Sequence, residues 1–203
     1  FSLSNHKVLY ANGIYDKVYP ASITKIMTAM LALQSGKLND TVTITQDNVT
    51  LEDGSQVCGF VAGDQVTLDQ LLHCLLVYSG NDAASAIAEY VGGNTENFVQ
   101  MMNDYAAKLG CTGTHFSNPH GLQDENHYTT PYDIYLMLNE AMNYKEFTQI
   151  TQMPSYGSCY ERTSVSGDEF TASEYQQLVN IKRIQLSLIV SVLCYRKFSA
   201  MFL

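Results

Sequence analysis

Apolar residues recur at helical spacing through most of residues 1–150, and this pattern predicts a helix-rich body. The strongest stretch covers residues 21–33; it is rich in Ala, Leu and Met, follows Pro20 and stops near Gly36. Strands are few before residue 150, with short ones predicted over residues 7–11 and 42–45. Four further helices are predicted, and their expected N-terminal capping residues are Thr67, Asp82, Thr95 and Thr130.

The composition is that of an ordinary folded domain. Of 203 residues, 46% are apolar and 15% are charged, so the chain fits one domain, or one domain and a fragment. The net charge of −9 argues against a nucleic-acid partner, because phosphate binding needs a basic face. The longest apolar run, residues 184–193, is interrupted by polar residues and is shorter than the ~18–20 residues of a membrane span, so no transmembrane segment is predicted.

The charge of the chain changes abruptly near residue 180. Residues 1–180 contain 7 Lys or Arg and 20 Asp or Glu, whereas residues 181–203 contain four basic residues and no acidic one. We therefore divide the chain into an incomplete domain over 1–180 and an atypical tail over 181–203, with a frame alteration as one explanation of the tail.

Neither the cysteines nor the histidines form a standard metal pattern. No cysteine belongs to a C-x-x-C pair; the five are interpreted as buried or free thiols, and a structural disulfide stays open. His115, His120 and His127, with His73 elsewhere, match no standard zinc spacing, so a metallopeptidase is a minor alternative. The cysteines are Cys58, Cys74, Cys111, Cys159 and Cys194.

An S-x-x-K element, Ser22 to Lys25, stands at the start of the strongest predicted helix. Chance alone gives roughly one such match in a chain of this length, and Ser4 to Lys7 is a second. At a helix start, residues i and i+3 share a face about 5–6 Å apart, so the lysine amine can reach the serine hydroxyl. Burial could lower the lysine pKa from ~10.4 and make it a base for the serine. On this motif alone, an N-cap serine followed by a solvated lysine is the better interpretation.

An S-x-N element, Ser79-Gly80-Asn81, lies in the predicted break between two helices. A polar turn with Asn as a cap is the ordinary interpretation of such a sequence. The functional interpretation gives a site a second hydroxyl that relays protons and an amide that holds a substrate carbonyl.

S-x-x-K followed by S-x-N resembles the pattern of the serine penicillin-recognising enzymes. Residues 19–29 are similar to the nucleophile segment of low-molecular-weight D-alanyl-D-alanine carboxypeptidases, residues 79–84 to their second motif, and residues 109–122 to a later stretch. The resemblance covers roughly residues 5–150. It implies a serine β-lactamase/transpeptidase-like α+β fold, in which a helical cluster packs against an antiparallel sheet that is incomplete at its C-terminal end.

The resemblance also implies the roles of the site residues. Ser22 is the acylated nucleophile, Lys25 its general base, Ser79 the proton relay to the leaving amine, and Asn81 positions the peptide. The implied substrate is a peptidoglycan stem peptide ending in D-Ala-D-Ala, with β-lactam antibiotics as covalent inhibitors and no metal or organic cofactor. The implied location is extracytoplasmic, in the bacterial cell envelope.

The third motif of the family, K-[ST]-G, is missing, because no lysine in the sequence is followed by Ser-Gly or Thr-Gly. By the resemblance, its lysine would bind the substrate carboxylate and its strand would complete the oxyanion hole; one lost oxyanion donor costs ~3–4 kcal/mol in the transition state. A truncated or frame-altered remnant without catalysis is therefore an alternative. A β-lactamase is a less favoured one, since residues 82–180 contain no E-x-x-L-N box.

A frame alteration near codon 180 would leave family residues before it and unrelated residues after it. We then expect the gene downstream of codon 180, translated in its other two forward frames, to encode K-[ST]-G within a few tens of residues. If neither frame contains the motif, the tail is a divergent C-terminus, in which residues 184–193 form a buried strand that completes the sheet.

Overall fold

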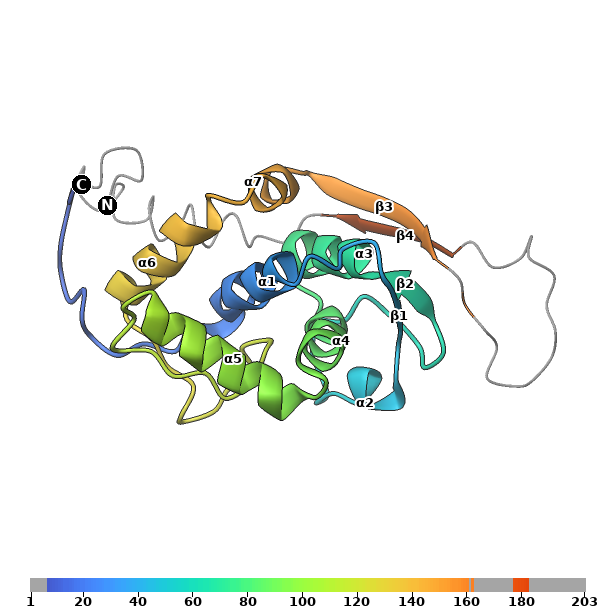
Figure 1. The fold of residues 1–203 in the computed structure, drawn as a ribbon, viewed down its shortest axis with the longest axis horizontal. Coiled ribbons are helices and arrows are strands. Elements are labelled where there is room, and N and C mark those ends of the chain that lie inside the picture. Colours follow the sequence, from blue (N-terminus) through green and yellow to red (C-terminus); the bar gives the residue numbers. More distant parts are fainter. Residues whose placement is uncertain (1–6, 161, 163–176, 183–203) are drawn as a thin grey trace.

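A central helix, α1 (Lys25–Gln34), organises the structure, a computed structural model that describes residues 7–160, 162 and 177–182 (Figure 1). Every residue of α1 from Lys25 to Ala32 is buried, as expected of a helix that other elements enclose. A 3-10 turn, η1 (Ala21–Thr24), leads directly into α1. The helix predicted over residues 21–33 is therefore confirmed, with its first turn wound more tightly than an α-helix.

Four helices pack around α1: α3 (Leu68–His73), α4 (Asn81–Gly92), α5 (Thr95–Lys108) and α6 (Pro131–Ala141). The short helix α2 (Gln46–Val49) lies against α4, and α7 (Lys145–Thr151) follows α6 in the chain (Figure 1). Asn81 to Ala88 of α4 are all buried, whereas α5 buries a stripe of residues spaced four apart, Phe98, Met102 and Ala106.

Two of the predicted helix caps are confirmed. Thr67 and Gln70 form a reciprocal capping box at the start of α3. The Thr130 side chain accepts a hydrogen bond from the Asp133 N–H, and Pro131 occupies the first position of α6, where its missing N–H costs nothing.

The two other predicted caps are wrong. Asn94, not Thr95, caps α5, because its side-chain oxygen is the one that reaches a free N–H of the first turn, that of Asn97. The N-cap position of α4 is Gly80, and Asp82 lies inside the first turn with its carboxylate turned toward another segment.

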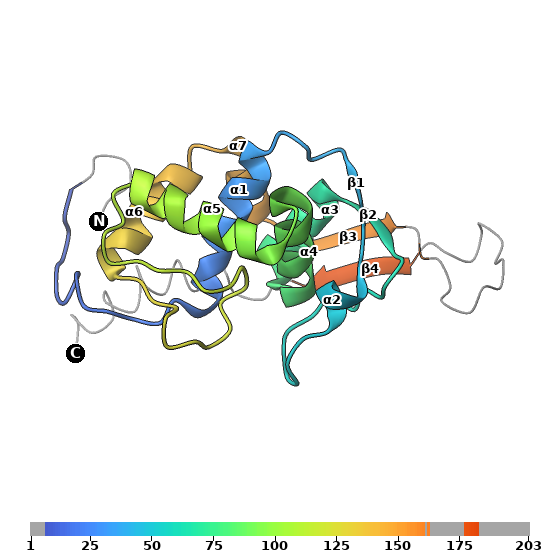
Figure 2. The ribbon, with the colours of Figure 1, turned by 60° about the horizontal axis from the view of Figure 1, so that its bottom comes forward.

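Two antiparallel strand pairs accompany the helices. β1 (Thr41–Thr43) pairs with β2 (Gln65–Thr67), and β3 (Ser155–Tyr160) pairs with β4 (Gln177–Lys182), as Figure 2 shows for the second pair. The β3–β4 pair packs on a π-helical turn, η2 (Cys74–Tyr78), that continues α3. The helical cluster against an antiparallel sheet, predicted as an α+β fold, is confirmed.

An ion pair joins Arg162, two residues after β3, to Asp64, which directly precedes β2. Arg162 donates from Nε and Nη2 to the two carboxylate oxygens of Asp64, over 2.9 and 3.0 Å. Asp64 is fully buried, so the bidentate pairing compensates for the water that its charge has lost.

The strand predicted over residues 7–11 is wrong, because this segment is irregular. Val8, Leu9 and Tyr10 are all about half exposed, so no alternation of a buried and a solvated face drives strand formation. The apolar run over 184–193 lies outside the described residues, and β4 ends just beyond residue 180. None of the helices that the structure describes is long and apolar enough to cross a bilayer.

Candidate active site

The turn η1 places Ser22 and Lys25 on one face. The backbone N–H of Lys25 donates to the carbonyl oxygen of Ser22, and in a 3-10 turn the side chains at i and i+3 eclipse. Ser22 is partly exposed, whereas Lys25 is 1% exposed. This pairing suits a hydroxyl that a substrate must reach and an amine that must lose its water.

Lys25 joins the two sequence motifs. Its Nζ donates to Oδ1 of Asn81 over 2.7 Å and to the backbone carbonyl of His120 over 2.8 Å. Burial lowers the pKa of Lys25 to about 7, against the opposing influence of the Asp82 carboxylate, which favours the charged form. Neutral amine is therefore available near pH 7, where an exposed lysine would be almost fully charged.

The neutral form of Lys25 has the hydrogen-bonding capacity that this site requires. A neutral amine carries two N–H donors and one lone pair, and Asn81 and His120 supply two acceptors. With both donors engaged, the lone pair is the remaining position at Nζ, and it can accept a proton. The arrangement can therefore hold Lys25 in place while its lone pair stays available to accept a proton.

The S-x-N turn is held in an unusual backbone conformation. Ser79 is 6% exposed and has φ +65°, a left-handed value that residues other than glycine rarely adopt. Gln56 brackets the turn: its side-chain amide donates to the carbonyl of Tyr78, and its backbone carbonyl accepts the N–H of Asn81 over 2.7 Å. Oδ1 of Asn81 faces Lys25 and accepts from its Nζ, which leaves the Nδ2 donors for another partner.

Asp82 has a structural contact that its sequence position did not indicate. Its carboxylate, 1% exposed, accepts the backbone N–H groups of Cys58 and Gly59 over 2.9 and 3.0 Å, with Phe60 at 3.4 Å. The capping role predicted for Asp82 is wrong, because its carboxylate is hydrogen-bonded to the backbone N–H groups of residues 58–60, and Gly80 occupies the N-cap position. The contact fixes the segment 56–60 beside the S-x-N turn.

A second segment, residues 117–122, closes over the start of α1. Besides the His120 carbonyl on Lys25, the Thr28 hydroxyl donates to the Pro119 carbonyl over 2.6 Å. Gly121, at φ +91°, lies so close to η1 that a Cβ there would stand 1.9 Å from the carbonyl oxygen of Ala21. Only glycine permits this approach.

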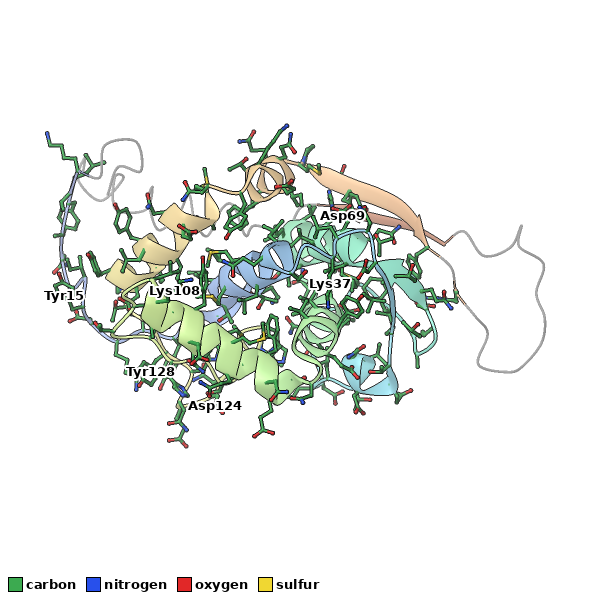
Figure 3. All side chains as sticks on the ribbon, viewed as in Figure 1. Tyr15, Lys37, Asp69, Lys108, Asp124 and Tyr128 are labelled. Atoms are coloured by element: carbon green, nitrogen blue, oxygen red, sulfur yellow. The ribbon has the colours of Figure 1, made fainter. Side chains whose placement is uncertain are left out.

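His127 binds Thr24, one of the two residues between Ser22 and Lys25. Its Nδ1 accepts the N–H of Ser117 over 3.0 Å, so Nε2 carries the proton and donates to Thr24 Oγ1 over 2.7 Å. Burial lowers the pKa of His127 to about 4, and the neutral tautomer persists at pH 7. The loop that carries this histidine runs through Asp124 and Tyr128 at the edge of the helical cluster (Figure 3).

Two strained backbone positions of the described residues lie beside this candidate site. Ala21 and Ser79 are the two non-glycine residues with positive φ in the part of the chain that the structure covers, at +48° and +65°. One directly precedes Ser22, and the other is the serine of the second motif. Strain at such positions persists only when surrounding contacts impose it, and it concentrates at functional sites.

Of the predicted residues, Lys25 and Asn81 are in direct contact, and Ser22 and Ser79 lie on the two segments that this contact joins. Sequence reasoning missed the contributions of His120, Gly121 and Asp82. Residues 109–122 resemble the family, but the sequence does not indicate that the His120 backbone carbonyl binds Lys25 or that Gly121 lies against Ala21. In the described part of the chain, no group of three or more His, Cys, Asp or Glu is placed to hold a metal.

Comparison with known proteins identifies the family of this chain. Residues 2–185 match the D-alanyl-D-alanine carboxypeptidase family, and the chain belongs to that family. The carboxypeptidase DacF of Bacillus subtilis is 38% identical over 149 residues, which is 71% of this chain and 38% of that protein. The chain therefore spans less than half the length of this curated relative.

Solved structures show the same fold. A D-alanyl-D-alanine carboxypeptidase of Mycobacterium tuberculosis has a TM-score of 0.75 and 31% identity, covering 91% of this chain and 64% of its own. Penicillin binding protein 6B of Escherichia coli has a TM-score of 0.70 and 32% identity, covering 74% of this chain and 50% of its own. The predicted transpeptidase-like fold is confirmed.

The contact of Gly121 with η1 predicts a strong effect of one methyl group. Gly54 is a matched control, because its φ is +82° and a Cβ there would meet nothing within 4 Å. We expect Gly54→Ala to lower the free energy of unfolding by about 1–2 kcal/mol through backbone strain alone. Gly121→Ala should cost about 1–3 kcal/mol more, because the Ala21 carbonyl must move. Urea unfolding measures both, and equal losses would contradict the close approach.

Proposed function

We propose that this chain forms the acylating site of a serine-type D-Ala-D-Ala carboxypeptidase acting on peptidoglycan stem peptides in the bacterial cell envelope, outside the cytoplasm. The observation that carries the proposal is the buried Lys25 amine, which has a pKa of about 7, lies on the face of Ser22 and is bound to Asn81. A surface lysine would be charged and could not serve as a base at neutral pH.

In the proposed reaction, Ser22 Oγ attacks the carbonyl carbon of the penultimate D-Ala while neutral Lys25 takes the hydroxyl proton. The carbonyl electrons move to oxygen, and the backbone N–H of Ser22 supplies one half of the oxyanion hole. Collapse of this intermediate breaks the peptide bond. The proton passes through Ser79 to the nitrogen of the terminal D-Ala, which leaves as a free amino acid. Nδ2 of Asn81 is the donor that holds a peptide carbonyl.

Water then hydrolyses the Ser22 ester and releases the shortened peptide. A β-lactam ring would acylate Ser22 by the same steps, but its amine stays tethered to the acyl group and cannot diffuse away. The proposal therefore makes β-lactams covalent inhibitors, in keeping with the penicillin binding named for the Escherichia coli neighbour. No step of this chemistry uses a metal or an organic cofactor.

The absence of K-[ST]-G from the sequence limits what the chain can do alone. The groups described above serve proton transfer and acylation, whereas recognition of the terminal carboxylate is the task that the resemblance gives to the missing lysine. A non-catalytic remnant over residues 1–180 with an altered tail over 181–203 is the alternative, and covalent labelling separates the two.

A fluorescent penicillin should label the purified protein covalently, and Ser22→Ala should reduce the label to background because the attacking oxygen is gone. Ser4→Ala is the matched control, since Ser4 belongs to the second S-x-x-K match and should leave labelling unchanged. Gel fluorescence after denaturation measures the covalent adduct. Labelling that persists in Ser22→Ala would place the nucleophile elsewhere, and a folded wild type without label would support the remnant.

The rate of that acylation should depend on pH through Lys25. The lysine acts as a base only when neutral, so below its pKa of about 7 the rate should fall roughly tenfold per pH unit and above it level off. Asp82→Asn should move the midpoint to lower pH, because the Asp82 carboxylate favours the charged amine. Labelling time courses between pH 5 and 9 measure both profiles, and a flat wild-type profile would exclude Lys25 as the base.

A further inference from the structure

Two thiols beside the site have no part in the proposed chemistry. Cys58 lies in the segment 56–60 and is partly buried, and Cys74 begins η2 and is 2% exposed. They are 16 positions apart in sequence, yet Cys58 Sγ lies 4.0 Å from the Cys74 carbonyl oxygen. The Cys74 side chain is also the largest cause that raises the pKa of the Cys58 thiol, in keeping with two neighbouring side chains.

The backbone on both sides of this contact is fixed. Asp82 accepts the N–H groups of Cys58 and Gly59, which holds in place the backbone that carries the Cys58 thiol. On the other side the thiol rests against Gly80, where an added Cβ would stand 2.4 Å from Cys58 Sγ. The Cys58 sulfur therefore lies between Gly80 and Cys74.

We propose that Cys58 and Cys74 are a covalent modification site, at which a disulfide oxidant forms a bridge between them. The inference does not rest on the proposed function, since it uses only the contact of the two thiols. Cys58 is the more exposed of the pair, so it is the sulfur that meets the oxidant first, and Cys74 resolves the intermediate.

The chemistry balances with oxidised glutathione as the oxidant. The Cys58 thiolate, formed by loss of its proton to water, attacks one glutathione sulfur, breaks the glutathione disulfide and releases one glutathione thiolate. The Cys74 thiolate then attacks the Cys58 sulfur and releases the second. Two thiols are oxidised, one external disulfide is reduced to two thiols, and the two protons go to the released glutathiones. Because the pKa of Cys58 is raised, its thiolate is scarce and the first step is slow at neutral pH.

The bridge would connect the segment 56–60 to the turn that precedes Ser79. Both are already joined through Asp82 and Gln56, so the disulfide would reinforce contacts that exist and would not pull the segments into a new arrangement. A bond of this kind stabilises mainly by restricting the unfolded chain. Oxidation should therefore raise the melting temperature by about 5 °C or more.

The test uses the full chain, first reduced and then incubated with oxidised glutathione at pH 8.5. Free thiols are alkylated in denaturant, and peptides from a non-reducing digest are identified by mass spectrometry. We expect one cross-linked species that joins the peptides of Cys58 and Cys74. Cys111, whose buried thiol donates to the Asp133 carbonyl over 3.7 Å, should be recovered alkylated.

Matched variants assign the thermal effect. The rise in melting temperature on oxidation should vanish in Cys58→Ser and Cys74→Ser and persist in Cys111→Ser. Recovery of both Cys58 and Cys74 as free thiols would overturn the proposal. So would a bridge from either of them to Cys159 or Cys194, or a stable glutathione adduct on Cys58. The mapping on the wild type decides the question even if a serine variant fails to fold.

Discussion

The structure depends on the solvation of one buried amine. Lys25 has exchanged bulk water for two fixed acceptors, an amide oxygen at the start of α4 and a backbone carbonyl from the segment 117–122. Removing either acceptor would leave a buried polar group unsatisfied, at a cost of ~1–3 kcal/mol. The start of α1, the start of α4 and the segment 117–122 therefore have to lie together at Lys25, and the other contacts of the site hold them there.

The buried carboxylate nearby shows how the amine avoids a fixed positive charge. A direct ion pair between Asp82 and Lys25 would hold the lysine in its charged form and remove its basicity. Asp82 instead is solvated by the backbone N–H groups of residues 58–60 and acts on Lys25 only from a distance. The segment 56–60 thus has an electrostatic role as well as a structural one, because its N–H groups stabilise the Asp82 carboxylate, which would otherwise pair with the Lys25 amine.

Local signals predicted much of this architecture, and long-range contacts account for what they missed. The helix over 21–33, the Thr67 box and the Thr130 cap depend on neighbours within four residues, so the sequence indicates them directly. Asp82 was predicted wrongly because its partners lie more than twenty positions earlier in the chain. The strand expected over 7–11 had suitable residue types, but strand formation depends on a face to bury, which composition does not reveal. Of the candidate site, the four side chains could be named in advance, whereas the Gly121 approach and the His120 carbonyl arise only from the fold.

The contact between Gly121 and Ala21 also has an evolutionary consequence. Ala21 has a left-handed backbone, and Gly121 lies against its carbonyl oxygen. A substitution at residue 121 would be accepted only in a lineage where the turn at residue 21 had already shifted, and such a shift would displace Ser22. Residues 21 and 121 are therefore expected to change together or not at all. The carbonyl oxygen of Ala21 thus restricts substitution at a position one hundred residues later in the chain.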